Sequence, residues 1–242
     1  MLDMRQVTKV YRTELVETHA LRSLDLHVGE GEFVAVTGPS GSGKTTFLNI
    51  AGLLETFSGG EFRLDGEDVR GLSDDARSKL RNQKIGFIFQ SFNLIPDLNL
   101  FDNCDVPLRY RGMPAAERKL RIEDALGLVG LGSRMKHYRA ELSGGQQQRA
   151  AIARALAGSP RLLLADEPTG NLDSQMARSV MELLEDINQQ GTTIIMVTHD
   201  PELAARAQRN VHIVDGMATD LSIEPGLSRA MHAQSEDAAT HA

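Results

Sequence analysis

A glycine-rich octapeptide, GPSGSGKT at residues 38–45, limits the folds open to this chain more strongly than any other part of its sequence. The apolar run EFVAVT at 32–37 comes directly before it and predicts a buried strand. After it, four apolar residues share one face of a predicted helix: Phe47, Ile50, Ala51 and Leu54. Such a turn can wrap backbone N–H groups around phosphate oxygens, and the helix start adds the positive end of its dipole. The sequence therefore predicts an α/β fold with a phosphate-binding turn.

The octapeptide matches the GxxxxGK[ST] pattern of nucleoside-triphosphate sites, in the strand-to-helix context that the pattern requires. Lys44 can reach the β- and γ-phosphates and stabilise charge in hydrolysis, and the hydroxyl of Thr45 can ligate Mg²⁺. The residues expected to contact the nucleotide here are Gly38, Pro39, Ser40, Gly41, Ser42, Gly43, Lys44, Thr45 and Thr46. The sequence has no Asn-Lys-x-Asp motif that would read guanine, which disfavours a GTPase.

The rest of the chain alternates short apolar runs with longer helical patterns, which is typical of a mostly parallel α/β sheet. The runs at 161–166 and 192–198 are further strand candidates. The helix between them ends near Gly191 and has one apolar stripe: Val180, Leu183, Leu184 and Ile187. Runs at 21–28 and 61–64 suggest short antiparallel strands.

The segment 91–158 contains no convincing strand and predicts helices only. One helix is expected to begin at Pro114, in its first turn, with Ile122, Ala125, Leu126 and Val129 on one face, and a second to cover about 145–157. The predicted fold is a P-loop α/β core with a mostly parallel sheet, an N-terminal antiparallel β subdomain and an inserted all-helical subdomain. Expected boundaries place the core with its β subdomain at 1–90 and 159–221, the helical subdomain at 91–158 and a disordered tail at 222–242.

Two carboxylates end the apolar run LLLA at 162–165. Asp166 leaves the predicted strand beside the phosphate-binding turn, where it can hold Mg²⁺ through water. Glu167, the next residue, can polarise an attacking water as a general base. Taken alone, the pair could equally be a surface pair; the nucleotide-binding turn favours the catalytic interpretation.

The pentapeptide LSGGQ at 142–146 predicts a second anion site. Ser143 can cap the helix that follows, while Gly144 and Gly145 leave bare backbone amides at its start, next to Gln146. One chain rarely needs two separate phosphate-binding helix ends for one nucleotide. The second site is therefore expected to serve the nucleotide of another copy.

In these motifs the chain resembles the nucleotide-binding subunit of ATP-binding-cassette (ABC) transporters over about residues 1–221. The resemblance implies an ATPase that uses ATP and Mg²⁺. It also implies a homodimer in which two ATP molecules lie head to tail, each between the P-loop of one chain and the LSGGQ segment of the other.

The resemblance assigns roles to four further residues. Gln90 resembles the Q-loop glutamine that contacts Mg²⁺ and the attacking water, and Asp173 lies in a D-loop at the dimer interface. His199 resembles the switch histidine at the γ-phosphate. Tyr11 resembles the aromatic residue that stacks on adenine.

A finer resemblance is to export-type ATPases of the lipoprotein-releasing, macrolide-export and cell-division group, through the segments 88–96, 142–149 and 165–173. It implies an integral membrane permease subunit as partner, driven through the helical segment. Two departures are Arg139, where a proline usually precedes the signature, and the polar segment 102–107. A regulatory ATPase that transports no substrate is the alternative function. DNA-repair and translation cassettes are disfavoured by the short spacing between Lys44 and Ser143 and by the single cassette.

Composition narrows the classes further. The 26 basic and 33 acidic residues give a net charge of −7, which argues against a nucleic-acid partner. Cys104 is the single cysteine, so an internal disulfide is excluded. The sequence has no apolar run near the roughly 20 residues of a membrane helix, and its first fifteen residues lack a signal-peptide core. The expected location is cytoplasmic, peripheral on the inner face of the cell membrane through the membrane subunit.

Overall fold

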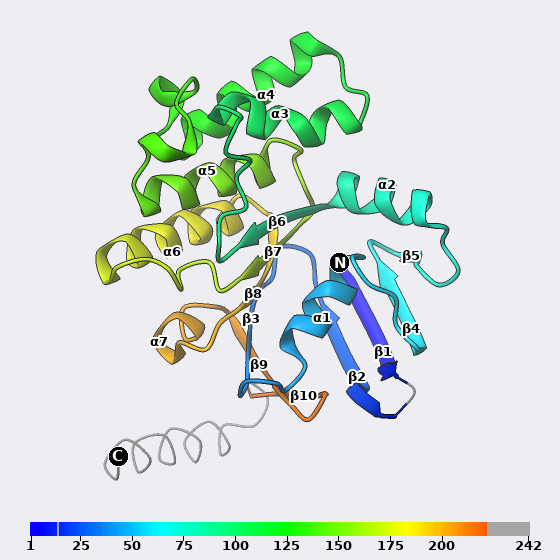
Figure 1. Ribbon diagram of the computed structural model, residues 1–242. Coiled ribbons are helices and arrows are strands. Elements are labelled where there is room, and N and C mark those ends of the chain that lie inside the picture. The colour runs from blue at the N-terminus through cyan, green and yellow to red at the C-terminus, as the bar shows by residue number, and fades with distance from the viewer. Residues whose placement is uncertain (14, 222–242) are drawn as a thin grey trace.

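The computed structural model describes residues 1–13 and 15–221 of the 242-residue chain. The tail predicted at 222–242 lies outside the described residues. The centre of the molecule is a six-stranded sheet in the order β10-β9-β3-β8-β7-β6 (Figure 1). Its strands are β3 Phe33–Thr37, β6 Ile85–Phe89, β7 Leu162–Asp166, β8 Thr193–Val197, β9 Arg209–Val214 and β10 Met217–Asp220. All neighbours pair in parallel except β10, which pairs antiparallel with β9.

A second sheet is antiparallel and lies beside the first (Figure 1). Its order is β2-β1-β4-β5, built from β1 Leu2–Arg12, β2 Glu17–Val28, β4 Gly59–Leu64 and β5 Glu67–Asp68. Helix α1 (Lys44–Ala51) packs against this sheet and the central one, with Phe47 and Ile50 fully buried. The observed layers confirm the predicted fold class.

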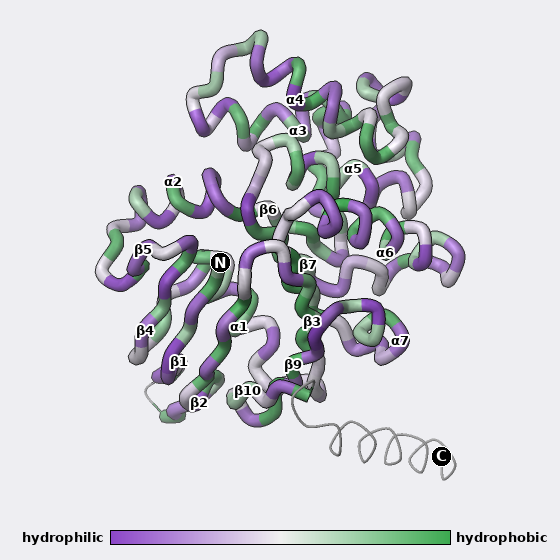
Figure 2. The backbone as a smooth tube through the Cα atoms, turned by 180° about the vertical axis from the view of Figure 1, so that it is seen from behind, coloured by the Kyte–Doolittle hydropathy of each residue, from purple (hydrophilic) through white to green (hydrophobic). Residues whose placement is uncertain are grey.

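The central strands β3, β7 and β8 are apolar along almost their whole length because both of their faces are covered. Figure 2 shows this as hydrophobic colour along the middle of the sheet. Alternate residues enter different cores: Val34 and Val36 pack with α1, whereas Ala35 packs with the helices of the other face. The sheet therefore separates two hydrophobic cores.

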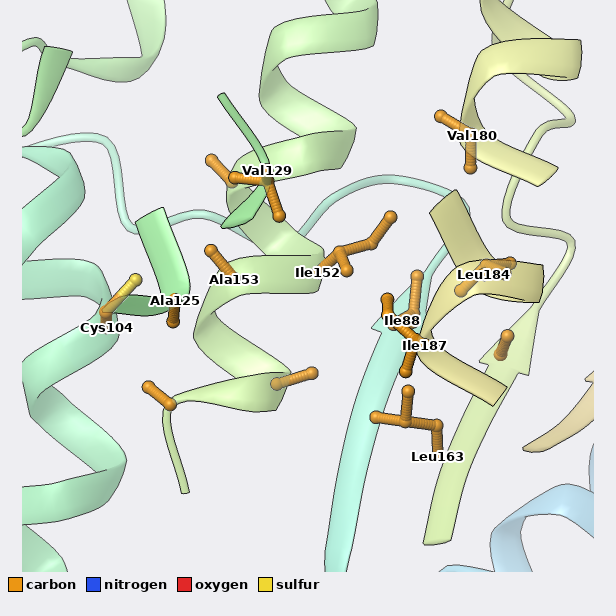
Figure 3. Packing of buried hydrophobic residues seen from close by; sticks show 14 of the residues in the cluster. Ile88, Cys104, Ala125, Val129, Ile152, Ala153, Leu163, Val180, Leu184 and Ile187 are labelled. Atoms are coloured by element: carbon orange, nitrogen blue, oxygen red, sulfur yellow. The ribbon is translucent and has the colours of Figure 1, made fainter. Parts of the chain in front are cut away.

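The second core contains the helices α3 Leu100–Tyr110, α4 Ala115–Leu128, α5 Gly144–Leu156 and α6 Ser174–Gln189. Ile152 of α5 points toward Ile88 of β6, and Leu184 of α6 lies nearby (Figure 3). Two 3-10 turns, Gly132–Arg134 and Arg139–Glu141, connect α4 to α5, and the remaining helices are α2 Asp74–Lys84 and α7 Pro201–Ala204. Between 91 and 158 the structure has helices and one isolated bridge, from Asn99 to Tyr138, and no strand.

Two local expectations need correction, and a third is confirmed. The predicted helix face from Phe47 to Leu54 is too long, because α1 ends at Ala51 and Leu53 has a left-handed φ of 56°. Leu54 is consequently 47% exposed. Pro114 caps α4 instead of occupying its first turn. Gly191 does follow the end of α6 with a φ of +99°, as predicted.

The polar departure at 102–107 has a structural explanation. Asn103 is buried and ties the preceding loop to α3 through the backbone N–H of Ile95, at 2.8 Å, and three carbonyl groups. Asp105 is also buried and pairs with Arg109 and Arg118, at 2.5 Å each. Cys104 is a buried thiol whose pKa burial raises to about 12. These residues stabilise the helical region.

Candidate active site

The loop 38–45 joins β3 to α1, and its glycines are required by close contacts. A Cβ atom at Gly38 would lie 2.1 Å from the carbonyl oxygen of Ile213, and one at Gly43 would lie 2.5 Å from that of Ala20. Both residues also have positive φ, at 144° and 107°. The loop is therefore held in place against β2 and β9.

Two polar side chains in this loop fit a phosphate ligand. The Lys44 ammonium donates to the carbonyl oxygens of Gly38 and Pro39, at 2.7 and 2.8 Å, so it already lies within the loop. Ser42 is buried, and among the described residues its Oγ has no hydrogen-bond partner. A phosphate oxygen would satisfy such a donor.

Asp166 and Glu167 lie at the carboxyl end of β7, beside the ends of β6 and β8. Burial, followed by the neighbouring Glu167 charge, raises the pKa of Asp166, and Lys44 opposes this shift. A half-buried carboxylate beside a phosphate loop is a suitable outer ligand for Mg²⁺.

Glu167 adopts a left-handed backbone conformation with φ 44°, which is uncommon for a residue with a side chain. Its N–H donates to the carbonyl oxygen of Val197, at 2.9 Å. Its carboxylate Oε1 lies 2.8 Å from Nδ1 of His199, whose side chain is 74% exposed. The structure thus brings together the predicted general base and the predicted switch histidine.

Gln90 follows the end of β6 at the same edge of the sheet. Its carbonyl oxygen accepts a hydrogen bond from Nδ2 of Asn171, at 2.9 Å. A Cβ at Gly170 would lie 2.6 Å from Nε2 of Gln90, so the glycine allows the glutamine side chain to approach. Gln90 is therefore in direct contact with Gly170 and Asn171 of the same chain.

Tyr11 lies on β1 near α1, and its hydroxyl donates to Oε2 of Glu55 at 2.6 Å. Burial and the Glu55 bond raise its pKa, while a hydrogen bond with Thr46 opposes them. The Lys9 ammonium lies 4.9 Å from the centre of the Tyr11 ring and 2.9 Å from Glu55. Lys9 and Glu55 were not predicted from the sequence as neighbours of Tyr11. Lys9 lies two residues before Tyr11 on the strand, which was the available signal.

The LSGGQ segment forms the start of α5. The Oγ atom of Ser143 accepts from the N–H of Gln146, at 3.4 Å, and Oε1 of Gln146 accepts from the N–H of Ser143, at 3.0 Å. This reciprocal capping box agrees with the predicted cap and adds Gln146 to it. Asp173 caps α6 through the N–H groups of Gln175 and Met176.

The P-loop and the LSGGQ segment start helices on opposite faces of the central sheet. Helix α1 belongs to the core formed with Val34 and Val36, and α5 to the core formed with Ala35 (Figure 1). The structure therefore groups Lys44, Asp166, Glu167, Gln90 and His199 along strand ends of one sheet. It leaves Ser143 at a separate helix start.

No metal-binding cluster of three or more His, Cys, Asp or Glu side chains occurs within residues 1–13 and 15–221. The Mg²⁺ site predicted from Thr45, Gln90 and Asp166 contains a single carboxylate, so this finding is compatible with it. Nor does any helix in that part of the chain reach the length and apolar character needed to cross a membrane.

Comparison with known proteins gives a consistent result. The family model described as "ABC transporter" matches residues 21–170. An uncharacterized ABC transporter ATP-binding protein of Thermotoga maritima is 45% identical, over 89% of this chain and 92% of its own length. The macrolide export ATP-binding/permease protein MacB of Marinobacter nauticus is also 45% identical over 89% of this chain, which spans 34% of that relative.

A solved structure supports the same assignment. The ATP-binding cassette MJ0796, in a dimeric post-hydrolysis state with ADP and Pi, superposes with a TM-score of 0.82 at 41% identity. The match covers 91% of this chain and 99% of the cassette. With the phosphate loop, the paired carboxylates and the LSGGQ helix in this fold, the chain belongs to the ABC transporter family and is one of its ATP-hydrolysing cassettes.

Proposed function

We propose that this chain dimerises around two MgATP molecules and uses their hydrolysis to drive an integral membrane permease subunit in export. The main support for the dimer is that the central sheet separates the P-loop, before α1, from the LSGGQ segment, at the start of α5. One nucleotide in the P-loop of a chain is then completed by the LSGGQ segment of a second copy, head to tail. The dimeric MJ0796 cassette is a precedent for two cassettes in contact.

The residues of the P-loop chain divide the hydrolytic work. Thr45, Asp166 and Gln90 would hold Mg²⁺, which supplies charge neutralisation on the phosphates when bound. Glu167 takes a proton from the attacking water, and His199 holds the Glu167 carboxylate in place at 2.8 Å. Lys44 moves from the loop carbonyls to the γ-phosphate and stabilises the charge that develops there. Tyr11, fixed by Glu55, offers its ring to the adenine.

A mixing experiment tests the head-to-tail dimer. Lys44→Ala removes the phosphate-binding ammonium but leaves LSGGQ intact, whereas Ser143→Arg blocks LSGGQ but leaves the P-loop intact. Each variant alone should be inactive. A mixed dimer contains one site in which both parts are wild type, so an equal mixture should recover up to about a quarter of the wild-type ATPase rate. An inactive mixture of two folded variants, in which Ser143→Arg still binds ATP, would refute the shared site.

The membrane partner is proposed to bind in a groove of about 780 Å³ between α2, β6 and α3. Its rim carries Tyr110, which is 86% exposed, and Leu54. Three arginines line it, namely Arg81, Arg111 and Arg154. The hydrogen bonds found for their guanidinium groups within the described part of the chain end on carbonyl, amide or hydroxyl oxygens and not on a carboxylate. An amphipathic helix with apolar and acidic side chains fits this surface.

Co-purification from gently solubilised native membranes tests this partner. The wild-type chain should bring down an integral membrane subunit. Tyr110→Asp should lose that subunit while the purified chain keeps its ATPase activity, and Leu120→Asp, on an exposed face of α4 outside the groove, should retain it. Equal recovery with both variants would exclude the groove.

Export is supported by the relatives named as macrolide export proteins, of which this chain covers about a third. Transport by vesicles containing the complete complex distinguishes export from a regulatory ATPase, because only the former moves substrate across the bilayer. Binding to a membrane subunit would place the chain peripherally on the cytoplasmic face.

A further inference from the structure

Gln148 lies on α5, two residues after the LSGGQ segment, and its side chain is fully buried. Its Nε2 donates to the carbonyl oxygen of Pro168 at 2.6 Å. Its Oε1 is buried without a hydrogen-bond partner in the part of the chain that is described. Burying Oε1 without a partner costs free energy, so the single bond of this glutamine is notable. That bond is with the residue that directly follows Glu167.

The turn at Glu167 needs such support. Its left-handed backbone costs on the order of 1–2 kcal/mol for a residue with a Cβ, and it persists only when neighbouring groups hold it. The N–H of Glu167 is bonded to Val197, and its carbonyl accepts from the N–H of Gly170, at 3.1 Å. Gln148 supplies the bond from the side of α5.

The start of α5 packs against the segment that follows this turn. A Cβ at Gly145 would lie 2.7 Å from Sδ of Met176, and one at Gly144 would lie 3.6 Å from Leu172. Ser143 and Gln148 are five residues apart on one continuous helical segment, or roughly 7.5 Å along its axis. A small tilt of the helix start therefore moves the Gln148 amide relative to Pro168.

We infer that Gln148 is a positioning residue that connects the LSGGQ end of α5 to the general base Glu167 of the same chain. This inference rests on the proposed function, in which LSGGQ binds the nucleotide held by the second copy. In each chain the start of α5 then binds the partner's nucleotide, and this binding changes the position of the chain's own Glu167 through Gln148. The two hydrolytic sites of the dimer are coupled through the two Gln148–Pro168 bonds, one in each chain.

The test compares Gln148→Met with Gln147→Met in the full-length chain. Methionine preserves side-chain length but cannot donate to Pro168. Gln147 is the matched control, because its Nε2 donates to the Leu142 carbonyl, at 3.0 Å, away from the Glu167 turn. We expect Gln148→Met to lower kcat by about 10- to 100-fold. KM should change less than about threefold, and the Hill coefficient should fall toward 1. MgATP-driven dimerisation, measured in chains that also carry Glu167→Gln, should likewise change less than about threefold.

The inference is overturned if Gln148→Met and Gln147→Met have equal kcat and equal Hill coefficients. It is also overturned if dimerisation falls as much as kcat, since the residue would then act only on assembly. A wild-type chain that hydrolyses ATP without dimerising would instead refute the proposed function. The two failures are thus distinguishable.

Gln148→Glu provides a second measurement if the methionine variant does not fold, since glutamate has the same shape. A protonated glutamic acid can donate to the Pro168 carbonyl, whereas the ionised form cannot. The ratio of its kcat to the wild-type kcat should rise as pH falls. Asp166, Glu167 and His199 are present in both chains, and the ratio compares the two chains at each pH. A ratio that does not change with pH would count against the positioning role.

Discussion

The loop before α1 and the start of α5 both present backbone N–H groups at a helix N-terminus, yet they are held by different kinds of neighbour. Gly38 and Gly43 of the P-loop approach the carbonyl oxygens of Ile213 and Ala20, which belong to strands. Gly145 of α5 approaches the flexible end of the Met176 side chain. The P-loop is therefore held rigidly by backbone neighbours, whereas the LSGGQ end of α5 contacts a side chain that can move.

The polar groups follow the same division. Lys44 satisfies carbonyl oxygens of its own loop and needs no partner to be folded. The Ser143 side chain bonds to Gln146 within the capping box, and in the proposed dimer the rest of its environment comes from another molecule. A site that is complete within one chain is stabilised by that chain, whereas a shared site depends on assembly.

The largest expected effect separates chemistry from assembly. Glu167→Gln should reduce the ATPase rate by about 10²- to 10⁴-fold, because the amide cannot accept a proton from water. MgATP binding and ATP-driven dimerisation should remain, as light scattering with and without MgATP would measure. Lys44→Ala is the control that should lose nucleotide binding as well. A monomeric Glu167→Gln chain at saturating MgATP would contradict the shared site.

The difference between rigid and yielding glycines can be tested directly. Gly38→Ala forces a Cβ against the Ile213 backbone and should destabilise the chain by roughly 2–4 kcal/mol. Gly145→Ala should cost about 1 kcal/mol or less, because Met176 can change rotamer. Thermal unfolding without nucleotide measures both. If the two variants lose equal stability, the two helix starts do not differ in rigidity.

A smaller effect concerns Asp166. Because burial raises the pKa of this carboxyl in the folded chain, the ionised form is less favourable there than in the unfolded chain. Stability is therefore lost as pH rises through that folded-state pKa. Asp166→Asn should raise the melting temperature by about 2–4 °C near pH 7, and by less near pH 4, while reducing hydrolysis. An equal gain at both pH values would exclude the electrostatic origin.

The smallest expected effect lies at the edge of the nucleotide site. Glu55→Gln retains a hydrogen-bond acceptor for Tyr11 but loses the ion pair with Lys9. We expect KM for ATP to rise by at most about threefold, since the acceptor for Tyr11 is kept and a single ion pair contributes little, with kcat unchanged. Steady-state kinetics beside Tyr11→Ala, which removes the ring itself, gives the comparison. A fall in kcat would show that this cluster reaches the reacting groups.

The sequence predicted what depends on neighbours in the chain. The P-loop, the strand ends with Asp166 and Glu167, and the cap of Ser143 all follow from local pattern, and the structure contains each element. Helix α2 was missed because it buries only Leu80 and so lacks an apolar stripe. The roles of Asn103 and Asp105 were missed because Asn103 bonds to the loop before α3 and Asp105 pairs with Arg118 of α4 as well as with Arg109 of its own helix.

The contacts that join the motifs could not be predicted from spacing. Gln148 and Pro168 are twenty residues apart, and Gln90 and Asn171 are eighty-one apart. Each pair meets because parallel strands bring their ends to one edge and α5 packs over that edge. Motif matching therefore located the parts of the site, but the bonds between them required the packed fold. The nucleotide contacts of Tyr11, Asp173 and the other site residues remain predictions.

The separation of two cores by alternate residues of one strand has a consequence for how this chain can change during evolution. Substitutions at Val34 and Val36 enter one core, and those at Ala35 the other, although all three are neighbours in sequence. Effects within one core should be epistatic, whereas effects across the sheet should be nearly additive. The face that carries the helices can thus drift toward new partners while the face beneath the phosphate loop stays under independent selection.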